Sequence, residues 1–108
     1  MKAGKKKKLE KAGWKVSSAD EFLGLSPEES AYIEMKLALC NSVKQARRKK
    51  RLSQVAFARK IASSQSRVAK MESGDPSVSI DLVLKSLFAL GVSTKDVAQT
   101  ITSVNRRS

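Results

Sequence analysis

The sequence predicts an all-α fold, and three observations lead to this prediction. Apolar residues recur at spacings of three and four through most of the chain after residue 26, which is the period of an amphipathic helix. Alternating runs of β-branched residues, which are typical of strands, are few. Pro27 and Pro76 are the only prolines among the 108 residues, so little in the chain breaks a helix.

A strong helix-start signal lies at residues 26–29. Ser26 is suited to accept from unpaired N–H groups, Pro27 suits the first helical position, and Glu29 can complete a capping box. The apolar spacing then predicts one long helix to about Lys50, roughly 35 Å in length. Its apolar positions are Tyr32, Ile33, Met35, Leu37, Leu39, Cys40, Val43 and Ala46. Since this is long for so small a domain, we expect its first turns to pack against the N-terminal segment or a second subunit.

Four shorter helices are predicted after Leu52, over about 54–61, 65–73, 77 or 79 to 90, and 94–102. Serines stand where the caps belong, and Gly74 and Gly91 stand where helices end. The inner positions of the first two are expected to be Val55, Phe57, Ala58, Ile61, Val68 and Met71.

The domain division follows the charge. Residues 1–25 form a basic N-terminal extension, in which residues 1–17 carry seven lysines against one acid. So dense a charge should keep that segment extended or loosely ordered in isolation. Within the extension, residues 18–21 match a capping box that opens a short turn ending at Gly24. Trp14 is expected to anchor the segment on the domain or on a partner. Residues 26–104 form the helical domain, with an elongated first helix.

The composition excludes several kinds of chemistry. The chain has no histidine and one cysteine, Cys40, so histidine bases, histidine-containing zinc sites and an internal disulfide are ruled out. No glycine loop suited to phosphates is present, and we expect no enzymatic activity, no metal and no cofactor. Cys40 falls in a helical apolar pattern and should be a small buried residue. No apolar run is long enough for a membrane span, and a cytoplasmic protein is expected.

The charge pattern indicates an anionic partner. The formal net charge is +12, which fits a nucleic-acid-binding protein or a basic protein with an adhesive tail. Between Glu34 and Glu72 there is no acidic residue but eleven cationic ones, namely Lys36, Lys44, Arg47, Arg48, Lys49, Lys50, Arg51, Arg59, Lys60, Arg67 and Lys70. An ordinary solvated surface mixes both signs, so this stretch favours a nucleic-acid surface.

The same stretch contains a pattern typical of a helix-turn-helix, over residues 53–73. Two short helices joined by a tight turn must cross steeply, and Ala58 supplies the small residue where they meet. The outer face of the second helix should then present Gln65, Ser66, Ala69 and Lys70. These side chains suit base edges in the major groove of DNA, although alone they could merely solubilise a helical turn.

A family resemblance rests on these residues. The segments Leu52-Ser-Gln-Val-Ala-Phe-Ala-Arg-Lys-Ile61 and Ser64-Gln-Ser-Arg-Val-Ala-Lys-Met-Glu-Ser-Gly74 resemble the lambda-repressor/Cro-like (Xre) helix-turn-helix family. The pattern covers about residues 43–97. It implies a five-helix DNA-binding domain that acts as a homodimer on a palindromic operator in double-stranded DNA.

The resemblance also implies a role for each matching residue. Base reading is implied for Gln65, Ser66, Ala69 and Lys70, and phosphate contact for Gln54, Ser64, Arg67 and Arg51. The residue at the Gln54 position also braces the recognition helix in the family. An ion pair between Arg47 and Glu72 is implied by position, although Arg47 could instead be another DNA-facing cation. The family commonly has glycine where this chain has Ala62, and a left-handed backbone there would cost about 1–2 kcal/mol.

A looser resemblance concerns residues 13–29. Gly13-Trp-Lys15 and Glu21-Phe-Leu-Gly-Leu-Ser-Pro-Glu-Glu29 are similar to a subgroup that includes antitoxins of the host-inhibition-of-growth type. That resemblance implies an RNase-type toxin as partner, with Trp14 in the contact, and autoregulation of an operon. A stand-alone phage-type regulator is the nearest alternative. An RNA-binding or adaptor protein is a further one, although residues 43–71 lack the exposed aromatic side chains that RNA recognition commonly uses.

Overall fold

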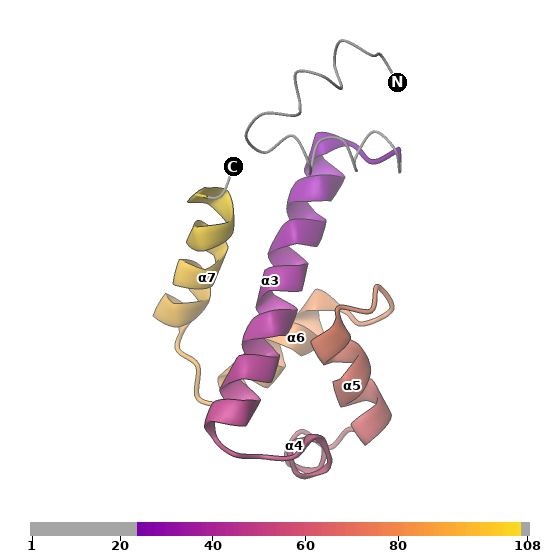
Figure 1. Cartoon of the computed structure of the whole chain (residues 1–108), viewed down its shortest axis with the longest axis vertical. Coiled ribbons are helices and arrows are strands. Elements are labelled where there is room, and N and C mark those ends of the chain that lie inside the picture. Colours follow the sequence, from indigo (N-terminus) through magenta and orange to yellow (C-terminus); the bar gives the residue numbers. More distant parts are fainter. Residues whose placement is uncertain (1–23, 107–108) are drawn as a thin grey trace.

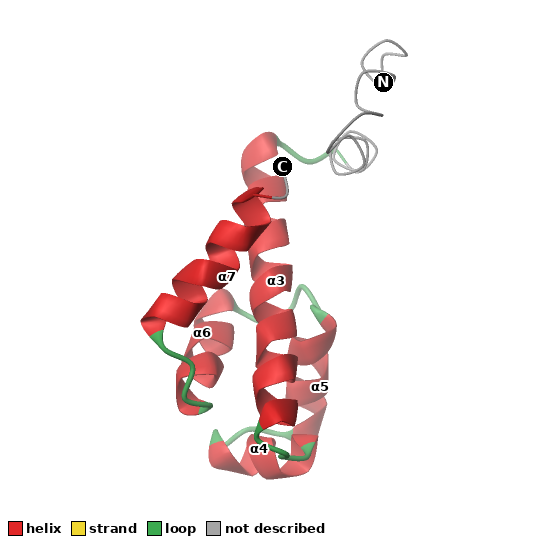
Figure 2. Cartoon of the chain, turned by 60° about the vertical axis from the view of Figure 1, so that its left-hand side comes forward, coloured by secondary structure: helices red, strands yellow, loops and turns green. Residues whose placement is uncertain are grey.

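The computed structural model describes residues 24–106, and within them the fold is all-α, as the sequence predicts. Five helices follow one another: α3 (Pro27–Lys49), α4 (Gln54–Lys60), α5 (Gln65–Ser73), α6 (Ile80–Ala89) and α7 (Thr94–Arg106). No strand occurs in this part of the chain. Helix α3 is the central element, with α7 along one side and α4, α5 and α6 around its C-terminal half (Figures 1 and 2). The basic extension, with Trp14 and the capping box at 18–21, lies almost wholly outside the described residues, so those predictions stay predictions.

Helix α3 begins where the sequence places its start. The Ser26 hydroxyl accepts from the backbone N–H of Glu29 at 3.1 Å, and the Glu29 carboxylate accepts from the N–H of Ser26 at 2.9 Å. Pro27 occupies the first turn, where its missing N–H costs nothing. At the other end the last turn carries Arg47, Arg48 and Lys49, which are favourable beside the negative end of the helix dipole.

The N-terminal half of α3 leaves part of its apolar stripe exposed. Leu39, Cys40 and Val43 are buried, and burial raises the pKa of the Cys40 thiol. By contrast, the exposed fractions of Tyr32 and Leu37 are 45% and 47%. Packing of this half against the N-terminal segment or a second subunit therefore stays a prediction, and the exposed stripe is what either partner would cover.

Helices α4 and α5 form the expected helix-turn-helix pair. Figure 1 shows α4 almost end-on while α5 runs in the plane of the view, so the two cross steeply. Phe57 and Ala58 of α4 are buried, and so are Val68 and Met71 of α5. The prediction that Val55 faces inward is wrong, because half of its surface is exposed. In a helix of two turns it lies about 160° around the axis from Phe57, and therefore points away from the core.

Two residues adopt a left-handed backbone without being glycine. They are Arg51 (φ 58°), after α3, and Ala62 (φ 54°), in the turn between α4 and α5. The Ala62 conformation is the one that glycine would adopt without strain, and here it costs on the order of 1–2 kcal/mol. Hydrogen bonds hold this turn: the N–H of Ser63 donates to the carbonyl of Ala58 at 2.8 Å, and that of Ala62 to Arg59 at 3.1 Å.

Helices α6 and α7 complete the domain. Ser79, rather than Ser77, caps α6, since its hydroxyl accepts from the N–H of Leu82 at 3.1 Å. Helix α7 runs to Arg106, four residues beyond the predicted end at about Thr102. It packs along α3, where the hydroxyls of Ser42 and Thr100 lie 3.4 Å apart.

One core joins all five helices. Its twelve buried members are Leu39, Cys40, Val43, Phe57, Ala58, Val68, Met71, Val78, Val83, Leu87, Leu90 and Val97. Phe57 is the single aromatic side chain among them. Helix α5 thus lies on a packed base that fixes its position, while its other side remains free.

Gly74 generates a stability prediction, because two constraints meet at this residue. Its φ is +80°, and a Cβ added there would lie 2.5 Å from Cδ2 of Leu37. We expect Gly74→Ala to lower the free energy of unfolding by about 1–2 kcal/mol through the left-handed backbone. Leu37 should add little to this loss, because the contacting methyl ends a flexible side chain that is 47% exposed and can turn aside. Urea unfolding followed by circular dichroism measures the loss.

The matched control is Gly91→Ala. Gly91 also has a left-handed backbone (φ +87°), but its added Cβ would meet only the Lys50 side chain, at an ordinary 3.7 Å. It should therefore show the backbone cost alone. The two losses should therefore be similar, and a much larger loss for Gly74→Ala would show that Leu37 cannot turn aside.

Candidate nucleic-acid interface

The outer face of α5 is free, which is the condition on which the predicted interface depends. Gln65, Ser66 and Lys70 are exposed, and Ala69 is half-buried between them and the core. Among the described residues no other segment covers these three side chains. The inner positions of the same helix, Val68 and Met71, are fully buried. Helix α5 therefore presents polar and cationic groups outward from a rigid base.

The start of α5 is fixed by Ser64. Its hydroxyl accepts from the N–H of Arg67 at 3.1 Å, and its backbone is extended, as an N-cap requires. At the other end Gly74 closes the helix in the left-handed conformation, with its N–H donating to Met71 at 3.1 Å. These caps limit α5 to nine residues, which places Gln65 and Ser66 in its first turn.

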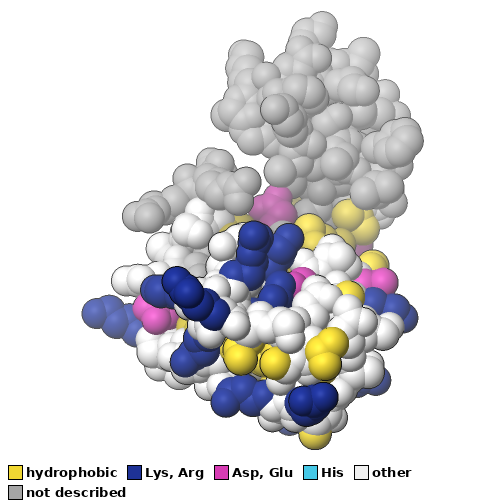
Figure 3. Space-filling view, turned by 60° about the horizontal axis from the view of Figure 1, so that its bottom comes forward, with side chains coloured by type: hydrophobic (Ala, Val, Ile, Leu, Met, Phe, Trp, Pro, Cys, Tyr) yellow, Lys and Arg dark blue, Asp and Glu magenta, His cyan; other side chains and the backbone are white. Residues whose placement is uncertain are grey.

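Exposed cationic side chains lie on α5 and at the ends of α3 and α4. Eight of the eleven cationic residues between Glu34 and Glu72 are exposed: Arg48, Lys49, Lys50, Arg51, Arg59, Lys60, Arg67 and Lys70. They lie at the end of α3, at the end of α4 and on α5. Figure 3 views the end of the molecule where α3 stops and α4 lies, and Lys and Arg side chains outnumber Asp and Glu there. Such a surface attracts a polyanion at long range.

Arg47 is not part of that surface. Its side chain is 12% exposed and pairs with the carboxylate of Glu72, which is 4% exposed. Nε donates to one carboxylate oxygen and Nη2 donates to the other, at 3.0 Å. Nη1 donates to the carbonyl of Leu52 at 2.7 Å. The hydrogen bond to Glu72 raises the pKa of Arg47 above its ordinary value. The ion pair that the resemblance implies is thus present, and the alternative of a DNA-facing Arg47 is wrong.

Gln54 joins the ion pair to the recognition helix. Its Nε2 donates to Oε1 of Glu72 at 3.1 Å. Its Oε1 accepts from Nε2 of Gln65 at 2.7 Å. Gln54 is half-buried at the start of α4, so this side chain braces Gln65. The bracing of the recognition helix that the resemblance implies for Gln54 is thus present, although the sequence predictions did not name Gln65 as the residue that Gln54 holds.

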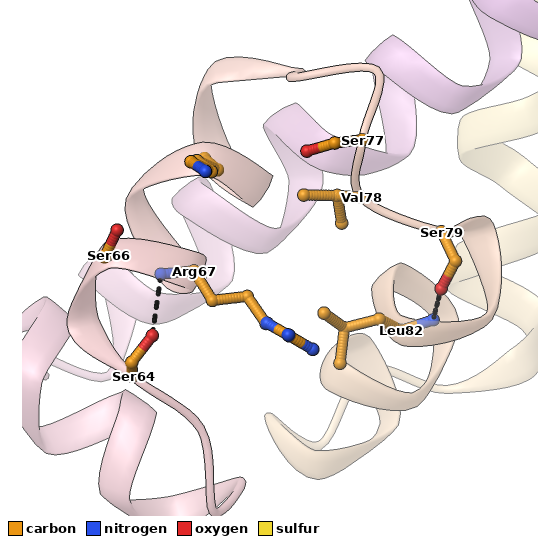
Figure 4. A pocket seen from close by; sticks show the side chains of 8 residues that line it. Ser64, Ser66, Arg67, Ser77, Val78, Ser79 and Leu82 are labelled. Atoms are coloured by element: carbon orange, nitrogen blue, oxygen red, sulfur yellow. Dashed lines mark hydrogen bonds between the residues drawn. The ribbon is translucent and has the colours of Figure 1, made fainter.

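A polar pocket opens beside α5, and sequence reasoning did not find it. It has a volume of about 330 Å³ and lies between the outer turns of α5, the loop after it and the start of α6. Its lining residues are Ser64, Ser66, Arg67, Lys70, Ser77, Val78, Ser79 and Leu82. Figure 4 shows the Arg67 side chain reaching across this space from α5 toward Leu82. The pocket depends on how a loop folds back beside a helix, which no local pattern specifies.

Asp75 shapes the loop that borders the pocket. Its Oδ1 accepts from the N–H of Ser77 at 2.8 Å, and hydrogen bonding to Ser77 holds the pKa of the carboxyl below its ordinary 3.8. A carboxyl with a lowered pKa stabilises the fold above its ordinary pKa and ceases to do so as the pH falls through the lowered one. The loop is therefore in its stabilised form throughout the neutral range. Lys36 of α3 adds a hydrogen bond from Nζ to the carbonyl of Pro76, at 3.3 Å.

Comparison with known proteins identifies the family. A family model described as helix-turn-helix matches residues 43–97, about half of the 108-residue chain. The chain belongs to this Xre/Cro-like helix-turn-helix family. The match confirms the resemblance at the family level, and the family is a DNA-binding one, not an enzymatic one. At a significant level the chain matches no curated protein and no solved structure. None of the helices in the described residues is long and apolar enough to cross a membrane.

The buried ion pair yields a stability prediction. Arg47→Met leaves the Glu72 carboxylate without its cationic partner in a place where water cannot replace it. We expect the free energy of unfolding to fall by about 3–5 kcal/mol, measured by urea unfolding. The matched control is Lys85→Met, which removes an ion pair with Asp81 between side chains that are 76% and 75% exposed. That change should cost less than about 1 kcal/mol. Similar losses for the two variants would show that the buried pair is not stabilising.

Proposed function

We propose that this protein is a transcriptional repressor that binds a palindromic operator as a homodimer, in the cytoplasm. Family membership supports DNA binding, and one observation supports the manner of binding. Helix α5 exposes Gln65, Ser66 and Lys70, and further exposed cations lie on α5 and at the ends of α3 and α4. Two such helices would enter successive major grooves, roughly 34 Å apart on one side of the duplex. A repressor of this kind acts by occluding the promoter.

The proposed base contacts follow the chemistry of the exposed side chains. The amide of Gln65 suits adenine, and the ammonium of Lys70 suits guanine N7 and O6. Ser66 can bond to several bases, while the methyl of Ala69 suits the methyl group of thymine. These four residues project from one helix face, so they would read adjacent base pairs in one groove.

The proposed phosphate contacts involve the pocket next to α5 and residues outside it. The pocket next to α5 combines the Arg67 guanidinium with the hydroxyls of Ser66 and Ser77, a set of donors that suits a backbone phosphate. Ser64 also lines the pocket and would contact the same phosphate. Gln54 on α4 and the exposed Arg51 would contact other phosphates. Contacts of this kind dominate affinity and make it strongly dependent on salt.

Two substitutions separate base reading from phosphate contact. Gln65→Ala should relax preference at one base pair, at a cost of about 1–3 kcal/mol for the preferred base. Arg67→Ala should weaken binding to all duplexes to a similar degree and reduce the slope of log K against log salt by about 0.9. Fluorescence anisotropy on duplexes selected from a random library, at several salt concentrations, measures both effects.

Lys95→Ala is the control for loss of one positive charge. Lys95 lies at the start of α7, which packs on α3 and not on α5. This variant should leave both base preference and salt slope unchanged. If Gln65→Ala and Arg67→Ala both keep wild-type affinity and preference, the assignment of α5 as the recognition helix is wrong.

We further propose that the protein is the antitoxin of a type II toxin–antitoxin pair and autoregulates its operon. Support comes from the resemblance of residues 13–29 to antitoxins of the host-inhibition-of-growth type. The partner would be an RNase-type toxin, with Trp14 in the contact. The alternative, a stand-alone phage-type regulator, shares the same DNA-binding surface.

Co-expression distinguishes these two functions. The product of the adjacent open reading frame should arrest growth when expressed alone, and the full-length chain should relieve the arrest and co-purify with it. Trp14→Ala should weaken that complex while binding of the isolated protein to the operator stays unchanged. An adjacent product that neither arrests growth nor co-purifies would leave the stand-alone regulator as the function.

A further inference from the structure

We infer that Glu72 is a positioning residue that determines which base Gln65 reads. This inference rests on the proposed function, since it concerns the base contact of Gln65. The observation behind it is a continuous chain of hydrogen bonds from the buried carboxylate, through Gln54, to the exposed amide of Gln65. We call this chain the amide relay.

The first step of the amide relay follows from the chemistry of a carboxylate. An ionised carboxylate only accepts hydrogen bonds, whereas a glutamine amide has a donor end and an acceptor end. Gln54 must therefore turn its Nε2 toward Glu72. Nε2 of Gln54 lies 3.1 Å from Oε1 of Glu72. Without Glu72 either orientation of the Gln54 amide would be open, because the two ends are nearly equal in shape.

The second step transfers that direction to α5. Once the nitrogen of Gln54 faces Glu72, its oxygen faces Gln65 and can only accept. Gln65 must then turn its own Nε2 toward Gln54, at 2.7 Å. Its Oε1 and its second N–H remain free on the exposed face. One acceptor beside one donor is the pattern that pairs with N6 and N7 of adenine.

A reversed relay would present a different pattern. If Gln65 turned its oxygen toward Gln54, its whole NH₂ group would point outward. Two donors match N7 and O6 of guanine instead of adenine. The direction of the relay thus selects between the two purines, and Glu72 sets the direction from a position that is 4% exposed and that DNA does not reach.

Arg47 fixes the carboxylate in turn. It donates to both oxygens of Glu72, so the carboxylate cannot rotate away from Gln54. Oε1 of Glu72 accepts hydrogen bonds from both Arg47 and Gln54. The ion pair therefore serves recognition as well as stability, which a purely structural pair would not.

The test is selection of duplexes from a random library by the full chain, with four variants beside the wild type. Gln65→Ala identifies the base pair that Gln65 reads, as the position whose preference disappears. At that position the wild type should prefer adenine over guanine on the order of ten- to a hundredfold. Glu72→Gln lets the relay run in either direction, and Gln54→Met interrupts it while leaving the ion pair intact. Both should reduce the preference to within about threefold of unity. Lys70→Ala should change a different position and leave this one alone.

Failure of the inference and failure of the proposed function give different results. Retention of the adenine preference by Glu72→Gln or by Gln54→Met overturns the inference, and so does a wild type that prefers another base there. Gln54→Met covers the case in which Glu72→Gln fails to fold, which thermal unfolding reports. If the wild type enriches no duplex, the proposed function itself fails.

A measurement on the free protein tests the amide relay without DNA. One proton of the Gln65 side-chain amide should exchange with solvent more slowly in the wild type than in Gln54→Met, as observed by nuclear magnetic resonance. Equal exchange rates in the two proteins would overturn the relay even if the protein binds DNA.

Discussion

The carboxylate of Glu72 is the constraint on which the helix-turn-helix depends. A buried charge costs several kcal/mol unless it is paired and fully hydrogen-bonded, and Glu72 is 4% exposed. Glu72 satisfies that requirement by accepting hydrogen bonds from Arg47 of α3 and from Gln54 of α4. Because Glu72 itself belongs to α5, three helices must come to one place before its charge is compensated. The geometry of the recognition helix therefore follows from the need to satisfy one group.

This arrangement explains how a nine-residue helix can hold a defined orientation. Isolated helices of that length are unstable in water, so α5 depends on its contacts. Val68 and Met71 anchor it through apolar packing, which is not directional. The hydrogen bonds to Glu72 and Gln65 add direction, since they tolerate little rotation of the helix. Packing thus holds α5 on the domain, while the polar chain sets its rotation and the placement of its first turn.

Much of this fold could be predicted from the sequence because its signals are local. Ser26, Ser53 and Ser64 mark helix starts through their own hydrogen bonds, and Gly74 marks an end through its backbone, so these boundaries agree closely with the structure. Val55 was placed wrongly because the inner face of a two-turn helix is decided by tertiary packing. The hydrogen bond between Gln54 and Gln65 forms between residues that only folding brings together. The same is true of the pocket that Ser77 lines, so no local pattern in the sequence indicates either feature.

In the proposed complex, affinity and specificity depend on side chains of different mobility. Arg51 and Arg67 are exposed, and as long flexible side chains they can follow a phosphate backbone whatever its sequence. The Gln65 side chain is less flexible, because Gln54 holds its amide through a hydrogen bond. A group held in place before binding loses little entropy on contact and rejects a base that does not fit, whereas a mobile cation accepts most positions of an anion. It follows that the buried carboxylate ties specificity to the stability of the fold, while affinity can change through surface lysines and arginines without disturbing either.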